Sequence, residues 1–161
     1  TLGWYVPPKV ACNMIGSMSA QQRLNSQISF QFYTGSRLMQ RMYRPYLDEW
    51  GITYSQYLVL ECLWEEDGQT IADLSIPLDL DSGTLSPLLK RMENGGFVRR
   101  QADKTDYRRV LFFLTQRGQK LQDEAIVMEQ EIVKMLNFTD ADLKAIGTVM
   151  AKINPNGKFT D

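Results

Sequence analysis

The order of elements expected over residues 70–114 limits the possible folds of this chain more than any other feature. Two short segments with helical spacing of apolar residues are separated by a tight turn, and the second ends at Asn94-Gly95-Gly96. Glycine ends helices because it accepts a left-handed backbone conformation. Two β-prone runs, residues 97–100 and 110–114, follow on either side of a polar stretch. The segment therefore predicts two short helices and then a β-hairpin.

Capping patterns indicate where these helices begin. In a capping box, the side chain of a Ser or Thr just before the helix accepts from the backbone amide of the third helical residue. The side chain of that third residue in turn accepts from the backbone amide of the Ser or Thr. The segments that start at Thr53 and Thr70 fit this pattern, and Asp81 with Ser82 can cap the next helix. Because proline lacks an amide proton, we expect Pro77 to end its helix before or at that residue and Pro87 to bend the following one.

Longer helices are predicted on both sides of this segment. Apolar residues recur at helical spacing over residues 21–43, shortly before Pro45, and again from Thr115 to Met150 with a new capping pattern at Thr139. These apolar stripes exceed what one small domain can cover by itself, so we expect them to pack against a second copy. The predicted fold class is mainly α with a small β-hairpin wing, a winged helix-turn-helix that dimerises through its N- and C-terminal helices.

Both ends of the chain are expected to lie outside this domain. Residues 1–19 form a predicted tail without periodicity, in which Gly16-Ser17-Met18 is similar to a cloning junction before a start methionine. A native and a cloning-derived origin of this tail both stay open. Residues 155–161 form a second tail. Between the tails, residues 20–154 are expected to form a single domain. Within it, the dimerisation helices are predicted at 21–45 and 115–153 and the winged helix-turn-helix at about 53–114.

Composition disfavours catalysis. The chain has no histidine, which excludes histidine-based catalysis and the commonest metal sites. Cys12 and Cys62 have no repeating spacing, and no glycine-rich phosphate loop occurs, which disfavours a thiol peroxidase or reductase. The apolar stretches are too short to cross a bilayer. We expect a cytoplasmic protein that is not an enzyme and has no cofactor, metal or membrane partner.

Charge is segregated along the chain, although the net charge is only −1. Residues 45–81 carry nine acidic side chains and no Lys or Arg, whereas residues 82–120 carry nine basic and three acidic side chains. Such a basic stretch forms either a solvated surface or a phosphate-binding surface. Its position on the second short helix and the hairpin favours DNA binding.

Candidate DNA-binding residues supply small polar groups for base edges and cations for phosphates. Those on the second short helix are Ser82, Thr84, Ser86, Lys90 and Arg91. Those at the hairpin tip, which is short enough to enter a minor groove, are Lys104, Arg108 and Arg109. A winged-helix module that binds protein instead of DNA is the alternative, and salt-dependent DNA binding would separate the two.

Four segments carry a resemblance to a known family: YRPYLD at residues 43–48, ITYSQYL at 52–58, LDSGTLSPLLKRME at 80–93, and DYR at 106–108 before Leu114-Thr115. Over residues 24–118 the chain resembles the MarR family, specifically its organic-hydroperoxide-resistance regulators. The resemblance implies a homodimer on an inverted-repeat operator in double-stranded DNA, with recognition helices in major grooves and wings at minor grooves. It also implies that Pro87 belongs in the recognition helix and that Asp106 orients Arg108.

The same resemblance implies a sensing cysteine in a pattern of Gln, aliphatic, Cys and Phe near the start of the first helix. Residues 27–30 read QISF, so Ser29 occupies the cysteine position. A serine hydroxyl cannot become a sulfenic acid, so the peroxide switch cannot operate here. Either the serine replaces an original cysteine and mimics the reduced, DNA-binding state, or the natural protein uses another signal.

The family surrounds its sensing thiol with tyrosines, which are matched here by Tyr33, Tyr43 and Tyr54, with Tyr57 nearby. The alternative is that these rings only fill a dimer interface. Cys62 is expected to be a buried, inert thiol, and Cys12 is reactive only if the tail is native and docked. The expected function is repression of an organic-peroxide stress gene; a MarR-type regulator with a different small-molecule inducer is the alternative.

Overall fold

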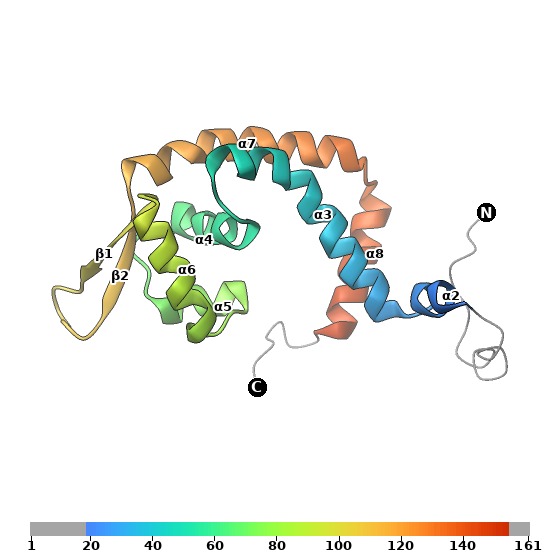
Figure 1. The fold of residues 1–161 in the computed structure, drawn as a ribbon, viewed down its shortest axis with the longest axis horizontal. Helices are drawn as coiled ribbons and strands as arrows, with labels where there is room; N and C mark the ends of the chain where they lie inside the picture. The colour runs from blue at the N-terminus through green and yellow to red at the C-terminus, as the bar shows by residue number, and fades with distance from the viewer. Residues whose placement is uncertain (1–18, 155–161) are drawn as a thin grey trace. The chain divides into compact units, whose positions relative to one another are not determined.

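The structure is a computed structural model that describes residues 19–154, and the chain divides between Arg44 and Pro45 into two compact units. The first unit holds α2 (Ala20–Asn25) and most of α3 (Ile28–Trp50). The second holds the end of α3 and the elements α4 (Tyr54–Glu65), α5 (Ile71–Leu78), α6 (Ser82–Asn94), β1 (Val98–Ala102), β2 (Val110–Leu114), α7 (Gln116–Leu136) and α8 (Asp140–Ile153) (Figure 1). The prediction of a mainly helical chain with one small β-hairpin is confirmed.

The single helix predicted over residues 21–43 is wrong at its start, because the chain divides into α2 and α3 at residues 26–27. The Ser26 hydroxyl donates to the Arg23 carbonyl oxygen at 2.8 Å, and Gln31 Nε2 donates to the Asn25 carbonyl oxygen at 2.9 Å. These side chains satisfy carbonyl groups that would otherwise accept from backbone amides, and so they compete with a continuous helix.

The predicted end of this helix at about residue 45 is also wrong, because α3 continues to Trp50. The proline removes a backbone hydrogen bond, at a cost of about 3 kcal/mol in a helix interior. Beyond it, Leu47 and Trp50 are buried. Burying an apolar side chain of this size contributes roughly 1.5–3 kcal/mol, so the two side chains together offset the loss.

The predicted capping boxes at Thr53 and Thr70 are confirmed. The Thr53 side chain accepts from the Gln56 amide, and the Thr53 amide donates to Gln56 Oε1 at 2.8 Å. Thr70 and Asp73 form the same reciprocal pair at the start of α5. Each box satisfies amide donors that have no partner within the first turn of a helix.

Pro77 does not end α5 where the sequence predicts, because the helix includes it and extends to Leu78. Asp79 then adopts a left-handed conformation with φ 50°, and its amide donates to the Ser75 carbonyl oxygen. This bond closes the helix beyond the proline. In the next helix, Pro87 lies inside a continuous α6, as the family resemblance implies, and the bend predicted at this residue stays a prediction.

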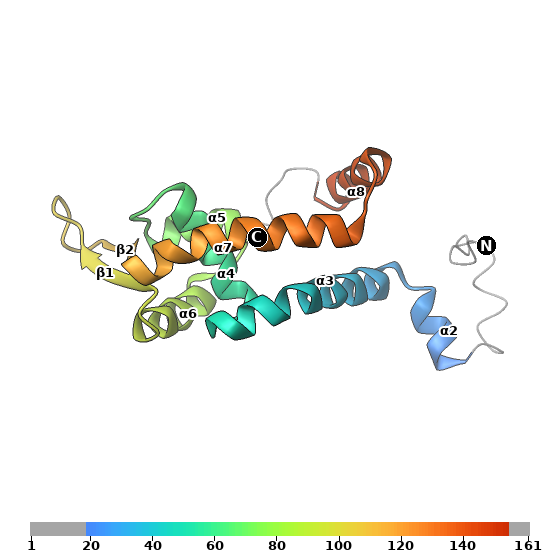
Figure 2. The same ribbon diagram turned by 90° about the horizontal axis from the view of Figure 1, so that it is seen from above.

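The hairpin is anchored to the loop between α4 and α5. Strands β1 and β2 are antiparallel, with Val98 opposite Leu114 and Ala102 opposite Val110, and their far end extends beyond α6 (Figure 2). The Leu114 amide donates to Asp67 Oδ1 at 2.8 Å, and Gln69 exchanges two backbone hydrogen bonds with Phe112. The base of the hairpin therefore cannot move independently of α4.

A continuous apolar core joins α4–α6, the hairpin and α7. Its completely buried side chains, all less than 2% exposed, are Val59, Leu60, Leu63, Leu74, Leu85, Leu89, Met92, Val98, Met128 and Ile132. Thr115 caps α7, as the sequence predicts, and Leu121 and Ala125 extend the buried face along it. This packing holds the helix pair and the hairpin in one unit.

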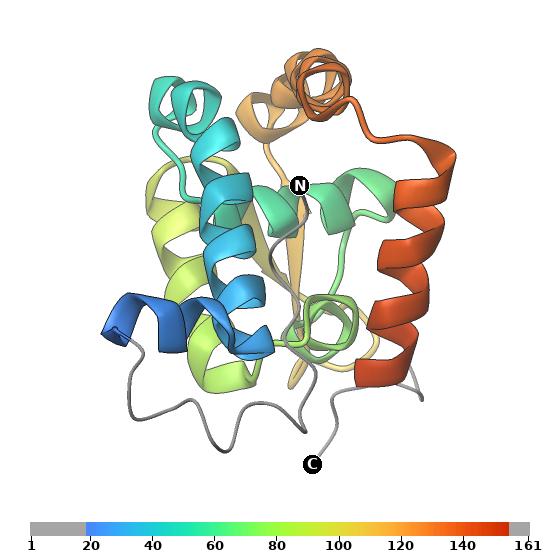
Figure 3. The ribbon, with the colours of Figure 1, turned by 90° about the vertical axis from the view of Figure 1, so that its right-hand side faces the viewer.

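None of the residues of α8 is buried within the described chain, a property that it shares only with the short helix α2 among the helices of residues 19–154. It follows a turn at Asn137, which has φ 49°, and leaves the end of α7 in a new direction (Figure 3). Its exposed apolar side chains are Leu143, Ile146, Val149, Met150 and Ile153.

Across residues 19–154, no helix is long and apolar enough to span a membrane. Nor do His, Cys, Asp and Glu side chains form a metal-binding group in this part of the chain.

Gly118 makes a specific prediction about the junction between the hairpin and α7. A Cβ at this position would overlap the Phe97 carbonyl oxygen and lie 3.1 Å from Leu114 Cδ2. Gly118→Ala should therefore lower the free energy of unfolding by roughly 1–3 kcal/mol, although alanine is the better helix former. The control Gln116→Ala, at an exposed position in the same turn, should change it by less than about 0.5 kcal/mol. Urea denaturation followed by circular dichroism measures both, and a more stable Gly118→Ala variant would contradict the packing described.

Candidate nucleic-acid interface

Helix α6 separates its side chains into an apolar and a polar face. Leu85, Leu88, Leu89 and Met92 are buried against the core, because residues three or four positions apart share one side of a helix. The predicted DNA-binding residues of this helix are all exposed: Ser82, Thr84, Ser86, Pro87, Lys90 and Arg91. The structure therefore brings them together on one surface, and their contact with DNA stays a prediction.

Asp81 holds the first turn of α6 in place. Its Oδ1 accepts from the Thr84 amide at 2.8 Å, and its Oδ2 accepts from the Thr84 hydroxyl at 3.0 Å. These hydrogen bonds stabilise the carboxylate and lower the pKa of Asp81 below its usual range. The Thr84 hydroxyl proton is committed to Asp81, which leaves its oxygen lone pairs to accept from a donor such as a base amino group.

At the wing tip, Asp106 and Arg108 form the pair that the sequence predicts. Asp106 Oδ1 accepts from the Arg108 amide at 3.1 Å and from Arg108 Nε at 3.2 Å. The Arg108 side chain remains 92% exposed. A guanidinium held on one edge and open on the other can still donate to an acceptor outside the protein.

A second carboxylate, Asp103, organises the same tip and was not among the predicted site residues. Asp103 Oδ1 accepts from the amide and the hydroxyl of Thr105, both at 2.7 Å, and the Asp103 amide donates to the Arg109 carbonyl oxygen at 2.9 Å. Arg109 Nη1 also lies 3.9 Å from Asp103 Oδ2. An Asp followed two residues later by Thr is typical of such a turn, so the signal was present in residues 103–105. Lys104, between them, is exposed.

Besides the two wing-tip arginines, three basic residues of the positive stretch contact protein groups. The Arg99 guanidinium lies 4.7 Å from the ring centre of Phe113, and that of Arg117 lies 4.2 Å from the ring centre of Phe97. Arg100 Nε is 3.4 Å from Glu93 Oε1. The exposed cations of α6 and the wing tip are Lys90, Arg91, Lys104, Arg108 and Arg109.

The predicted sensor residues are divided between the two units. Ser29 and Tyr33 are exposed on α3, where the Tyr33 hydroxyl accepts from Arg37 Nη1 at 3.2 Å. Tyr43 is buried near the end of the first unit. Tyr54 and Tyr57 lie on α4 in the second unit. The grouping of these residues around Ser29 stays a prediction.

Tyr57 occupies the centre of an aromatic cluster. Its ring centre lies 6.5 Å from that of Trp50, 6.1 Å from that of Tyr54 and 6.2 Å from that of Trp64. Its hydroxyl donates to Glu129 Oε1 at 2.6 Å. Burial and the neighbouring carboxylates raise the pKa of Tyr57 far above its usual value, so it remains a hydrogen-bond donor. Burial also raises the pKa of Tyr54.

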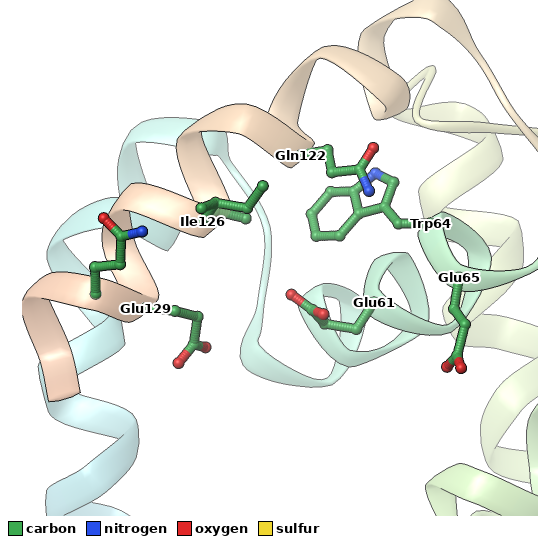
Figure 4. Close-up of a pocket in the computed structure, with 8 residues that line it drawn as sticks. Glu61, Trp64, Glu65, Gln122, Ile126 and Glu129 are labelled. Carbon is green, nitrogen blue, oxygen red and sulfur yellow. The ribbon is translucent and has the colours of Figure 1, made fainter.

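A depression of about 440 Å³ lies between α4 and α7 (Figure 4). Its lining residues are Glu61, Trp64, Glu65, Gln122, Ala125, Ile126, Glu129 and Gln130. The carboxylates of Glu61 and Glu129 face this space, whereas that of Glu65 points away from α7 (Figure 4). A surface with several carboxylates favours cationic over anionic groups.

Cys62, on α4, is a free and half-buried thiol. Burial, followed by the charges of Glu65 and Glu61, raises the pKa of Cys62. Because the thiolate is the form that peroxides oxidise, this thiol is poorly reactive, as the sequence analysis expected. Cys12 lies outside the described residues.

A capped helix with an exposed polar and cationic face, followed by a hairpin with a cationic tip, defines a winged helix-turn-helix DNA-binding protein. A family model for the MarR family matches residues 52–110. The organic hydroperoxide resistance transcriptional regulator of Bacillus subtilis (strain 168) is 39% identical over 128 residues, covering 80% of this chain and 87% of that protein. The chain belongs to the MarR family and is a DNA-binding transcriptional regulator.

Solved structures agree with this assignment. A structure of reduced AbfR bound to DNA has a TM-score of 0.69 and 38% identity, and the match covers 83% of this chain and 94% of that one. A structure of disulfide-formed AbfR has a TM-score of 0.59 and 37% identity, covering 88% and 98%. AbfR comes from Staphylococcus epidermidis. The predicted family and winged-helix fold are confirmed, and the relatives are regulators, not enzymes.

Asp81 provides a test of how the recognition helix is held. Asp81→Ala removes the cap and should lower Tm by a few degrees, whereas Asp81→Asn keeps an equivalent cap and should stay close to the wild type at neutral pH. Because the folded pKa of Asp81 is lowered, its carboxylate contributes stability above its unfolded pKa of about 3.9, and this contribution is lost as pH falls through the folded value. Thermal unfolding between neutral and acidic pH compares the three proteins. Equal Tm values for Asp81→Ala and Asp81→Asn at neutral pH would contradict this role.

Proposed function

We propose that this chain is a homodimeric repressor that binds an inverted-repeat DNA operator in the cytoplasm and controls a gene of the organic-peroxide response. The main support is the exposed polar and cationic face of α6 together with the wing and its oriented Arg108. The similarity to an organic hydroperoxide resistance regulator supports the class of gene.

Dimerisation would cover apolar side chains that are exposed in one chain. On α8 these side chains are Leu143, Ile146, Val149, Met150 and Ile153. On α7 they include Val127, Val133 and Met135. In the first unit, Leu24, Ile28 and Phe32 are also exposed. Such extended apolar patches mark association surfaces, and a closed dimer of two identical chains buries equivalent patches on both partners.

In this proposal, α6 enters the major groove and the wing tip contacts the neighbouring minor groove. Ser82, Thr84 and Ser86 can exchange hydrogen bonds with base edges, while Lys90 and Arg91 contact phosphates. Pro87 brings an apolar surface to the same face. The wing supplies Lys104, Arg108 and Arg109, with Asp106 orienting Arg108. Two copies of α6 would read half-sites about one helical turn apart, or roughly 34 Å.

Arg108 provides the test of this interface. Arg108→Ala should weaken binding about tenfold or more and reduce the slope of log affinity against log salt by about one, because one phosphate contact is lost. The probe is a duplex of about 30 base pairs, long enough for two half-sites one helical turn apart, selected by the wild-type protein from a random library and titrated at several salt concentrations. Lys120→Ala removes an equal charge from an exposed position on α7 and should leave the slope unchanged.

Sedimentation should show the same dimer mass for the wild type and both variants. Equal affinity and slope for Arg108→Ala and the wild type would show that the wing does not contact DNA. A wild-type affinity that does not depend on salt would contradict the whole interface.

The serine at position 29 favours a second candidate for the inducing signal, a small molecule other than an organic hydroperoxide. Without a thiol at this position, the hydroperoxide chemistry of the family's sensor has no reactive atom, and the depression between α4 and α7 offers space for a small molecule. A MarR-type regulator with a different small-molecule inducer is therefore the alternative to a serine that keeps the reduced, DNA-binding state.

The chain with Ser29 should remain on DNA when it is treated with cumene hydroperoxide, whereas the Ser29→Cys variant should be released. The new thiolate would attack the peroxide oxygen to give a sulfenic acid and an alcohol, and hydroxyl donors from Tyr43 and Tyr54 would stabilise that thiolate. Ser36→Cys, an exposed thiol elsewhere on α3, is the matched control and should stay bound. Gel-shift titration with and without peroxide compares the three proteins. Equal release of the wild type and the Ser29→Cys variant would place the sensor elsewhere.

A further inference from the structure

Three hydrogen bonds connect aromatic side chains to glutamates of α7. At the end of α3, the Tyr46 hydroxyl donates to Glu131 Oε2, and Trp50 Nε1 donates to Glu124 Oε2 at 2.8 Å. On α4, the Tyr57 hydroxyl donates to Glu129 Oε1 at 2.6 Å. All six residues lie in the second unit, so the three bonds join its own helices.

These glutamates lie on both sides of the buried face of α7. At 3.6 residues per turn, Ala125, Met128 and Ile132 form one narrow stripe, and each of them is at most 2% exposed. The same geometry places Glu124 and Glu131 along one edge of the stripe and Glu129 along the other. Helix α7 is therefore hydrogen-bonded to α3 along one edge of its buried stripe and to α4 along the other.

Apolar packing determines which face of a helix is buried but resists small rotations only weakly, because the hydrophobic effect has no preferred direction. Met128, at the centre of the stripe, is also a flexible side chain that adapts to shifts of its neighbours. Hydrogen bonds require defined distances and angles. A rotation of α7 about its axis in either direction would lengthen the bonds on one flank. The aromatic–glutamate bonds therefore restrict this rotation.

The orientation of α7 matters because of what it connects. At its start, the Thr115 hydroxyl donates to the Gly96 carbonyl oxygen, and Trp64 Nε1 donates to the Gly118 carbonyl oxygen at 3.0 Å. These contacts join α7 to α4 and to the loop between α6 and the hairpin. Its other end leads into α8, whose apolar face is exposed. In a dimer held through that face, the orientation of α7 determines where the two copies of α6 lie.

We propose that Tyr46, Trp50 and Tyr57, through Glu131, Glu124 and Glu129, are positioning residues that set the half-site spacing which the dimer accepts. This inference rests on the proposed dimeric, operator-binding function. None of the six needs to touch DNA. Tyr57 carries most of the effect, because its side chain is buried and its ring also contacts Trp50 and Tyr54.

The test compares binding to operators of different spacing. The selected duplex is remade with one or two base pairs inserted or deleted between its half-sites, and the dissociation constant is measured for each. The test variant combines Tyr57→Phe with Glu124→Ala and Glu131→Ala, which removes all three bonds while Trp50 and Tyr46 are kept. Its two alanines replace exposed residues. A strong helix former at each position supports folding of the dimer, which sedimentation and circular dichroism would verify.

The wild type should prefer one spacing by at least tenfold. The triple variant should lose about tenfold in affinity at that spacing and much less at the others. Its dissociation constants for the different spacings should therefore become nearly equal. Asp123→Ala, which removes an exposed carboxylate from the same helix, should keep the wild-type profile. Replacing Glu124, Glu129 and Glu131 together by Gln keeps an acceptor oxygen at each position and should also keep the preference for one spacing.

A uniform loss of affinity at every spacing, with the preference retained, would show a merely structural role and overturn this inference alone. If the triple variant does not fold, Tyr57→Phe is tested by itself and should lower the preference for one spacing at least threefold; an unchanged preference would overturn the inference. A wild-type chain that binds none of the duplexes would instead overturn the proposed function, and this inference with it.

Discussion

Burial of one face of α6 is the interaction on which the rest of this structure depends. Leu85, Leu89 and Met92 are completely removed from solvent, and burying side chains of this size contributes roughly 1.5–3 kcal/mol each. Because these residues recur every three or four positions, their burial determines the direction of every other side chain on the helix. The polar and cationic residues from Ser82 to Arg91 are exposed as a consequence, and the core of the domain thus creates the surface that we propose binds DNA.

The segregated charges have distinct physical roles. Acidic residues of the segment 45–81 act locally, as helix caps at Asp73 and Asp81 and as an acceptor for the base of the hairpin at Asp67. The basic residues of the following segment are partly used for contacts with aromatic rings, which leaves a smaller exposed group on α6 and at the wing tip. A carboxylate beside each wing arginine orients the guanidinium but does not bury it. A net charge close to zero is therefore compatible with a strongly positive surface for DNA.

In the proposed mechanism, helix α7 connects the part of the unit that carries α6 and the hairpin to the apolar helix α8. It is bonded to the hairpin and to α4 at one end and leads to the exposed apolar helix α8 at the other. Its contacts combine an apolar stripe with directional hydrogen bonds to Tyr46, Trp50 and Tyr57.

Local patterns in the sequence determined the caps at Thr53, Thr70, Asp81 and Thr115, the hairpin, and the exposed face of α6, because each depends on residues within a few positions of one another. The same patterns failed at Pro45 and Pro77, where burial and a left-handed residue outweigh the missing amide proton. Only the tertiary structure decided which glutamates accept from Tyr46, Trp50 and Tyr57, since these partners are more than 70 residues apart. Periodicity determines which side of a helix is apolar, but pairing across a fold requires knowledge of which helices are neighbours and at what angle they pack.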